Sequence, residues 1–194
     1  MEKQIVRFGV LNKAQKLQAV DLFLLGFGNF MTFSKDEEKK KQLFLEIFNP
    51  ELFLCYVDKE KVIGLMGLGT NKVRPINFKK EICQKYFGKF KGLIISKQMN
   101  SIFQKRVVKL DKELYIDTLV IHPSVRNKGV ATTLINEACS YKDYETIVVE
   151  VFSKNIIAIS FYMKNGFIIK KRHKCSMMRI FRSGYPVVMI KSKK

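Results

Sequence analysis

Two apolar segments on either side of a glycine-containing loop constrain the fold of this chain more than any other feature. Residues 114–121 form the first apolar segment and residues 146–152 the second. Between them lie a short polar loop, residues 124–131, and a stretch with helical spacing, residues 132–141. We expect the two segments to be parallel strands joined by the helix between them.

The loop contains the pattern Arg126-x-x-Gly129-x-Ala131. Small residues here let successive backbone N–H groups converge on one point without side chains in the way. The following helix directs its positive dipole end and its unpaired first-turn N–H groups at the same point. The pattern therefore predicts a phosphate or pyrophosphate site, with a plain strand-to-helix turn as the alternative. It lacks the Lys-Ser/Thr of the P-loop and two of the three glycines of the Rossmann pattern.

A second pattern follows the second strand, Asn155-x-x-Ala158-x-x-Phe161-Tyr162-x-x-x-Gly166-Phe167. In this order, the two patterns resemble those of the GNAT family of acetyl-CoA-dependent N-acetyltransferases. The resemblance is close over about residues 114–170 and elsewhere extends only to the order of strands and helices. It implies an α/β (α+β) fold with a central twisted sheet of antiparallel and parallel strands. The sheet is splayed between the two segments above, and helices cover both faces.

The resemblance also implies acetyl-CoA as the cofactor. In the family, backbone amides of the glycine loop hold the pyrophosphate, and the pantetheine arm lies beside the preceding strand as a pseudo-strand. The N–H of Leu119 would also polarise the thioester carbonyl, as an oxyanion donor does. Asn155 would be both the cap of its helix and a pantetheine contact. The implied cofactor-binding residues are Leu119, Val120, Ile121, Arg126, Asn127, Lys128, Gly129, Val130, Ala131, Thr132, Asn155, Ala158 and Tyr162.

Tyr162 occupies the family's usual place for a general acid that protonates the departing thiolate. A phenol has a reference pKa near 10 and a thiol near 8.5, so this transfer depends on proximity and electrostatics. The alternative is an aromatic core residue beside Phe161. Asp117 is the first candidate for the base, because strand alternation puts its side chain on the face of Leu119. Its alternative role is to attract a cationic amine or to cap a neighbouring loop.

Three aromatic residues are candidate contacts for the acceptor. Phe27 and Phe30 lie in a glycine-broken segment after the first helix, a region that forms one wall of the acceptor site in the family. Tyr115 alternates with Asp117 on the predicted strand and is expected to line the acceptor pocket. A satellite core under a loop is the alternative for the two phenylalanines.

We expect one domain over residues 1–194, with a helical insertion at residues 72–112. A family member needs only a short link at that point, whereas this chain has two predicted helices, residues 78–86 and 93–103. An insertion of this size suggests a cover over the acceptor site, with a helix pair packed on the sheet edge as the alternative. Upstream, Asn12 is the predicted cap of the first helix and Ser34 of the second.

The net charge of +19 favours a nucleic-acid partner as an alternative. The basic residues are mostly lysines spread along the chain and form no arginine-rich stripe with interleaved aromatics. The leading interpretation is therefore transfer of an acetyl group from acetyl-CoA to a primary amine by direct attack in a ternary complex. A nucleic-acid- or ribosome-associated binding module and an acyl-CoA-binding regulator without catalysis are the other two hypotheses.

Other features of the sequence bear on metal binding, cellular location and partners. The four cysteines, Cys55, Cys83, Cys139 and Cys175, are scattered without C-x-x-C spacing, which predicts no metal site and suits a reducing cytoplasm. No apolar run reaches the ~18 residues of a membrane span, and the N-terminus lacks a signal-peptide pattern. We therefore expect a cytoplasmic protein without a membrane partner. A homodimer is expected only because two-fold dimers are the commonest oligomers.

Overall fold

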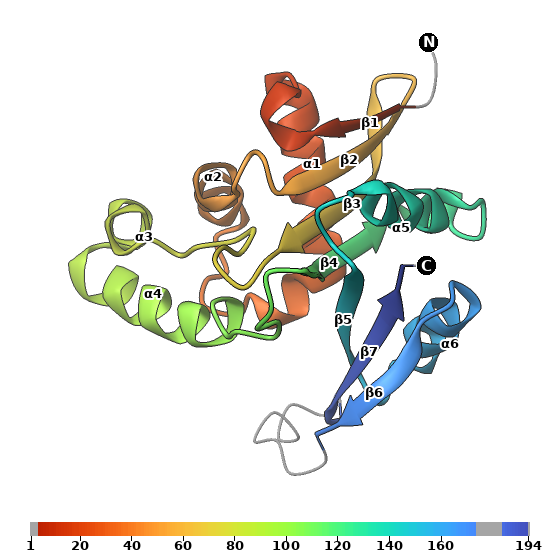
Figure 1. Cartoon of the computed structure of the whole chain (residues 1–194). Coiled ribbons are helices and arrows are strands. Elements are labelled where there is room, and N and C mark those ends of the chain that lie inside the picture. The colour runs from red at the N-terminus through yellow and green to blue at the C-terminus, as the bar shows by residue number, and fades with distance from the viewer. Residues whose placement is uncertain (1–3, 174–183, 194) are drawn as a thin grey trace.

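The computed structural model describes residues 4–173 and 184–193, so that Cys175 lies outside the described residues. A seven-stranded mixed sheet forms its centre, with the order β1-β2-β3-β4-β5-β7-β6 (Figure 1). The strands are β1 (Gln4–Arg7), β2 (Phe53–Asp58), β3 (Lys61–Gly69), β4 (Glu113–Ile121), β5 (Thr146–Phe152), β6 (Ile168–Arg172) and β7 (Pro186–Ser192). The helices are α1 (Lys13–Phe27), α2 (Glu37–Ile47), α3 (Lys80–Phe87), α4 (Lys89–Phe103), α5 (Val130–Ser140) and α6 (Ile156–Lys164).

Helices cover both faces of the sheet, as predicted. On one face, α1 and α2 bury a phenylalanine-rich cluster that includes Phe23, Phe44 and Phe53. On the other face, α5 and α6 close a second cluster around Leu134 and Phe167. Each fully buried side chain of this size contributes about 1.5–3 kcal/mol through the removal of apolar surface from water. The sheet is therefore held from both sides, and its strand ends are fixed in position.

The helix starts show one prediction confirmed and one corrected. Asn12 caps α1 through a capping box, in which its side chain accepts from the Gln15 N–H at 2.9 Å. The predicted cap of α2 at Ser34 is wrong, because the Asp36 side chain accepts from the Lys39 N–H at 3.0 Å. The Ser34 hydroxyl instead accepts from the Asp36 N–H at 3.1 Å. A carboxylate at the helix start is favoured over a hydroxyl by the helix dipole, which explains the shift.

The sheet splits between β4 and β5. These parallel strands are in register only from Glu113↔Thr146 to Ile116↔Val149. Beyond that point β4 stays with β3, and β5 stays with β7 as far as Phe152↔Pro186. Within the described residues, positions 117–121 of β4 thus have no strand partner on the β5 side. The predicted splay is present, and it leaves an open strand edge (Figure 1).

A β-bulge in β4 lies at the point where the strands part. The β3–β4 register passes from Leu68↔Ile116 to Gly67↔Thr118, which leaves Asp117 as an extra residue. The Thr118 hydroxyl accepts from the Gly67 N–H at 3.1 Å and fills the disrupted ladder position. Leu119 consequently packs in the same cluster as Ile116. The prediction that Asp117 and Leu119 share a face is therefore wrong, because the bulge breaks the alternation on which it relied.

The insertion at residues 72–112 contains α3 and α4, which form a hairpin that projects from one side of the molecule (Figure 1). The two helices pack so closely at Gly92 that an added Cβ would lie 2.5 Å from the Gln84 backbone. At the base of the hairpin, Phe78 packs edge-on against Phe33 and Phe44. The ends of the insertion are tied together, because the Asn71 side-chain amide donates to Asp111 at 2.8 Å. The insertion is thus held by the packing of Phe78 at the base of the hairpin and by the hydrogen bond that joins its two ends.

Candidate functional site

The loop before α5 forms an open cradle of backbone donors. Gly129 caps the helix with φ +81°, a left-handed conformation that glycine adopts without strain. Asn127 is also left-handed, with φ 61°. The first turn of α5 contains no acidic residue, and no side chain among residues 4–173 and 184–193 caps its N–H groups. An added Cβ at Gly129 would have no neighbour within 4 Å. These N–H groups are therefore free to bind an anion.

Two basic side chains border this cradle, and the open strand edge leads into it. Arg126 and Lys128 are both exposed. The unpaired stretch of β4 ends at Ile121, and a short 3-10 turn, η3 (Pro123–Val125), connects it to the loop. An extended chain laid along β4 would therefore reach the helix start with its anionic end. This is strand addition followed by anion binding at a helix N-terminus.

Tyr162 lies on α6, on the same side of the sheet as α5. It is only 5% exposed and contacts Phe167 at 5.1 Å between ring centroids. Burial raises the pKa of its hydroxyl above the usual value, so the phenol stays protonated at neutral pH. Within residues 4–173 and 184–193 its hydroxyl forms no hydrogen bond. Asn155 caps α6 as predicted, accepting from the Ala158 N–H at 3.1 Å.

The insertion supplies a cation to Asp117, the predicted base. Arg74 holds both carboxylate oxygens, with Nη2–Oδ1 at 2.9 Å and Nε–Oδ2 at 3.2 Å. The two side chains are 8% and 6% exposed. Burial raises the pKa of Asp117, and the Arg74 guanidinium opposes that shift. A carboxylate bound at both oxygens is poorly placed to accept a further proton, so the ion pair competes with the predicted role as a base.

A second carboxylate, Glu150, lies at the same level on β5. Its partner is Lys105, at an Nζ–Oε2 distance of 3.8 Å, and Glu150 is 17% exposed whereas Lys105 is 49% exposed. This pair is longer and more accessible than the one between Arg74 and Asp117. The negative charge of Glu150 also raises the pKa of Asp117, which indicates that the two carboxylates are close. Both parted strands thus carry a carboxylate matched by a basic residue of the insertion.

Phe30 reaches the opening, whereas the other two predicted acceptor contacts are packed. Phe30 is 42% exposed and stacks on Phe152 of β5, with 6.0 Å between ring centroids and 13° between planes. Phe27 instead stacks on Phe23 of its own helix. Tyr115 is 5% exposed and packs against Val108 of the segment that returns from the insertion. The prediction that Tyr115 lines an open pocket is therefore corrected, because that segment covers it.

The sequence reasoning missed Arg74, Lys105, Glu150 and Phe152. A charged residue inside the otherwise apolar segment 146–152 was a signal for Glu150. Arg74 and Lys105 lie in the insertion, outside both strands, and no local pattern connects them with the opening. Two cavities, of about 420 and 340 Å³, lie around Tyr141 and around Asn49, and Arg74 also lines the second. In the described residues, no group of three or more His, Cys, Asp and Glu could hold a metal.

The site thus joins an open strand edge to a cradle of backbone donors at a helix start. The sequence matches the model of the Acetyltransferase (GNAT) family over residues 21–167, more than half of the chain. The protein therefore belongs to the GNAT family. It is an acetyl-CoA-dependent N-acetyltransferase, as the two sequence patterns predicted. No curated protein matches the chain.

Solved structures share the fold at low sequence identity. An N-acetyltransferase from Staphylococcus aureus Mu50 has a TM-score of 0.64 and 13% identity, over 96% of this chain and 99% of that one. An aminoglycoside 6'-N-acetyltransferase complexed with coenzyme A has a TM-score of 0.59 and 16% identity, over 97% and 96%. A spermidine N-acetyltransferase chimera from Vibrio cholerae has a TM-score of 0.58 and 15% identity, over 99% and 96%. At such identities the likeness concerns the fold alone.

Proposed function

We propose that the protein transfers the acetyl group of acetyl-CoA to a primary amine by direct attack in a ternary complex. The observation that carries this proposal is the open β4 edge, residues 117–121, leading into the uncapped start of α5. Acetyl-CoA supplies an activated thioester. The residues of the chain bind it, orient it and manage the proton transfers.

The cofactor-binding half uses mainly the backbone. The N–H groups from Asn127 to Thr132 hold the pyrophosphate, whereas those of Val125 and Arg126 already donate to the carbonyls of His122 and Pro123. The side chains of Arg126 and Lys128 add positive charge. The backbone of Leu119 and Val120 pairs with the amides of the pantetheine arm along the open edge. The Leu119 N–H also donates to the thioester carbonyl, where negative charge develops during the reaction. Asn155 and Ala158, at the start of α6, border the arm on its other side.

Tyr162 is proposed as the acid that protonates the departing thiolate. The phenol carries its proton at neutral pH, but burial raises its pKa and makes it a weaker acid, so the transfer depends on the proximity of the departing thiolate. The amine must lose a proton before it attacks. Asp117 remains the first candidate to receive that proton through water, once the opening admits solvent beside its ion pair with Arg74. Phe30 and Phe152 form an apolar wall for the acceptor.

Calorimetric titration of acetyl-CoA into Gly129→Asp and Gly129→Asn tests the cofactor site. Both side chains tolerate the left-handed conformation and have nearly the same shape, so that they differ mainly in charge. We expect the aspartate to weaken binding about 30-fold relative to the asparagine, since a carboxylate near the pyrophosphate costs about 2 kcal/mol. Equal affinity of the two variants would place the pyrophosphate elsewhere. Spermidine and an aminoglycoside belong in the first acceptor panel, because similar folds act on them.

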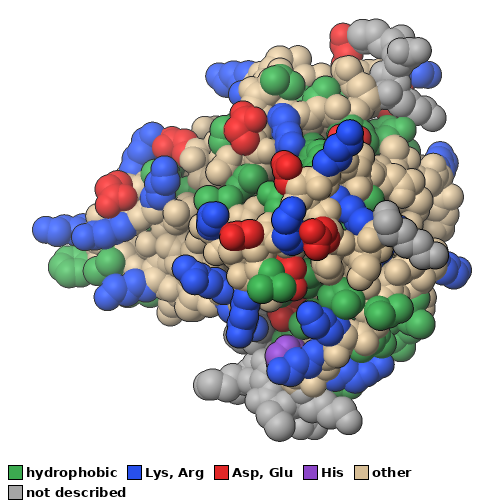
Figure 2. Space-filling model, viewed as in Figure 1, with side chains coloured by type: hydrophobic (Ala, Val, Ile, Leu, Met, Phe, Trp, Pro, Cys, Tyr) green, Lys and Arg blue, Asp and Glu red, His purple; other side chains and the backbone are tan. Residues whose placement is uncertain are grey.

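A nucleic-acid-binding role is the second candidate, favoured by the distribution of charge. Residues 72–112 contain twelve Lys and Arg and two Asp and Glu, a net charge of +10 within a total of +19. Figure 2 shows several of these Lys and Arg side chains over α3 and α4. Binding of a short RNA that persists at moderate salt would support this role. An affinity lost by about 200 mM salt would leave only non-specific attraction.

A further inference from the structure

We propose that the acceptor is the α-amine of an acidic peptide, held at the mouth of the splay by the basic residues of the insertion. This inference rests on the proposed function and names its substrate class. Some charges at the opening are neutralised by an ion-pair partner, whereas others are left over and are free to attract a substrate.

Each carboxylate found on this face of β4 and β5 has a basic partner. Asp117 is bound by Arg74, and Glu150 by Lys105. Glu113, at the start of β4, lies 3.9 Å from Lys170 of β6 and accepts from the Lys109 N–H at 3.0 Å. A site for a polyamine or an aminoglycoside needs free carboxylates to match several ammonium groups. This face offers none among the described residues, so a polycation would have to displace lysine or arginine.

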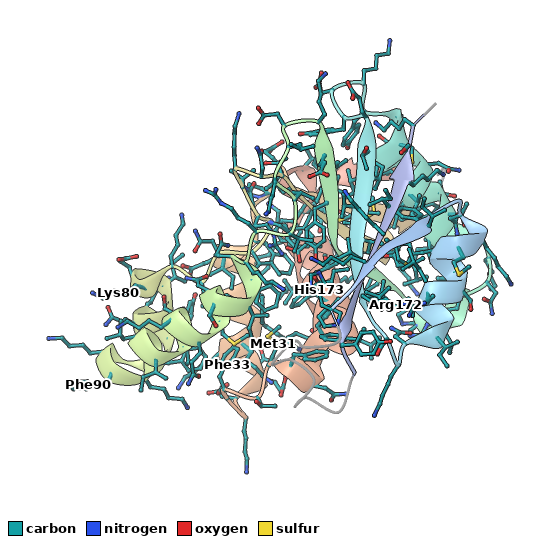
Figure 3. All side chains as sticks on the ribbon, turned by 60° about the horizontal axis from the view of Figure 1, so that its bottom comes forward. Met31, Phe33, Lys80, Phe90, Arg172 and His173 are labelled. Carbon is teal, nitrogen blue, oxygen red and sulfur yellow. The ribbon has the colours of Figure 1, made fainter. Side chains whose placement is uncertain are left out.

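Positive charge remains in excess around the opening. Four basic residues of the insertion, Arg74, Lys85, Lys105 and Lys112, pair with carboxylates outside it, so that a net charge of +6 is left from its +10. Its return segment, residues 104–112, packs on the sheet beside Tyr115 and Val148. At the same end of the sheet as Phe152, β6 ends with Arg172 and is followed by His173 (Figure 3). A surplus of this sign attracts anionic molecules and repels cationic ones. The amine must therefore be carried on a molecule whose other groups are acidic.

The ion pairs of Asp117 and Glu150 also limit which class of amine can lose its proton and react at this site. Both oxygens of Asp117 are occupied by Arg74, and Glu150 faces Lys105, so that each carboxylate is already engaged by a cation. A polyamine or lysine side chain, with a pKa near 10.4, would arrive almost fully protonated at neutral pH. The α-amine of a peptide has a reference pKa of about 7.7–8.0 and loses its proton readily. An α-amine thus suits a site whose carboxylates are engaged in ion pairs, whereas a side-chain amine does not.

The walls of the opening favour a peptide over a nucleic acid. Phe30 and Phe152 stack on each other, which leaves neither ring free on both faces to intercalate a base. The basic residues placed at the opening, Arg74, Lys105 and Arg172, recognise carboxylates and phosphates alike. The amines of nucleic-acid bases are conjugated with the ring and are poor nucleophiles. A peptide offers the reactive amine and the anionic groups in one extended chain.

The experiment measures acetyl transfer from acetyl-CoA by mass spectrometry to two octapeptides with the same first residue and a free α-amine. One carries four glutamates and the other four arginines, which offer no further acceptor amine. Spermidine and an aminoglycoside complete the panel. We expect kcat/KM for the acidic peptide to exceed that for the basic peptide and for both polycations by about 30-fold or more.

A charge reversal at Lys105 separates recognition from structural support. We expect Lys105→Glu to raise KM for the acidic peptide about tenfold and to lower it for the basic peptide, with smaller changes in kcat. Lys142→Glu, at the other end of β4, makes the same change in net charge and should alter neither value by more than about twofold. A loss of activity on both peptides would mean that Lys105 only maintains the structure, and it would overturn its place in recognition.

The outcomes distinguish a failure of the acidic-peptide inference from a failure of the proposed acetyl transfer. Equal or better transfer to the basic peptide or to spermidine overturns the inference and leaves the proposed function standing. Binding of acetyl-CoA without transfer to any amine overturns the proposed function, and the inference with it. The nucleic-acid alternative is tested by competition. If an RNA of matched charge suppresses acetylation of the acidic peptide far more than an N-acetylated copy of that peptide does, the surface serves nucleic acid, and the inference fails.

Discussion

The two sides of the splay differ in the groups that they present, which are backbone groups on one side and side chains on the other. On the cofactor side, a left-handed glycine, an uncapped helix start and an open strand edge present backbone groups, and few side chains are required. On the acceptor side, the opening is defined by side chains, and two of the decisive ones, Arg74 and Lys105, come from the insertion. Backbone geometry can stay constant while side chains change. If the proposed function holds, cofactor binding depends on the backbone of the sheet and of α5, and acceptor choice depends on the insertion.

The ion pair between Arg74 and Asp117 provides the largest expected effect. Arg74→Met leaves a carboxylate buried without its partner, and we expect a loss of about 3–5 kcal/mol in the free energy of unfolding. Lys72→Met, which removes an exposed pair with Asp111 at 3.3 Å, is the matched control and should cost less than about 1 kcal/mol. Urea unfolding of both variants makes the comparison. If Arg74→Met costs no more than the control, the insertion is not coupled to the sheet through this pair.

The pH dependence of the same variant gives a second measurement. Burial raises the pKa of Asp117, and Arg74 opposes the rise, so that removing Arg74 raises the pKa further. When the pKa of a carboxyl group in the folded protein exceeds its unfolded value of about 3.9, the protein loses stability as the pH rises from the unfolded pKa to the folded one. Arg74→Met should therefore be closer to wild type at pH 5 than at pH 7.5. Adding Asp117→Asn should remove the difference between the two pH values.

Tyr162→Phe tests the proposed proton transfer from the phenol to the departing thiolate. We expect kcat to fall about 100-fold with KM nearly unchanged, since the hydroxyl is needed only when the thiolate departs. Phenylalanine keeps the ring contacts with Phe161 and Phe167, so stability should be preserved. Tyr144→Phe, near the other end of β4, is the control. A rise in KM with unchanged kcat would assign Tyr162 to binding instead of proton transfer.

The sequence predicted the local structure around the glycine loop and the two strands in detail because its signals are local. The glycine at position 129, the apolar segments and the Asn155 cap each act over a few residues, and the structure contains all of them as predicted. The acceptor side depended on events without a local signal. The bulge at Asp117 changed which side chains share a face, and residue alternation alone could not reveal it. The ion pair with Arg74 joins residues 43 positions apart and requires knowledge of how the insertion packs.

Gly92→Ala tests whether the insertion positions the acceptor side. The new methyl group would lie 2.5 Å from the Gln84 backbone, so α3 and α4 must separate. We expect a loss of about 1–2 kcal/mol in stability, since the packing strain exceeds the gain in helix propensity. The acceptor kcat/KM should fall, whereas the Kd for acetyl-CoA should stay the same. Ser101→Ala, on the exposed face of α4, is the control. A parallel loss of cofactor affinity would contradict the division between the two sides.

The smallest effect is expected at the outer tip of the hairpin, where Phe90 is 81% exposed (Figure 3). Phe90→Ser removes a side chain that buries little surface, so the stability should change by less than about 0.5 kcal/mol. Phe78→Ala, at the fully buried base, should cost about 3–5 kcal/mol by the same unfolding measurement. If only the base of the insertion serves the opening, Phe90→Ser should also leave kcat/KM for the acceptor unchanged. A loss of more than about threefold would extend the acceptor surface to the tip. If Phe90→Ser elutes later than the wild type on size exclusion, the tip is a contact between two copies of the chain. The same measurement tests the expectation of a homodimer.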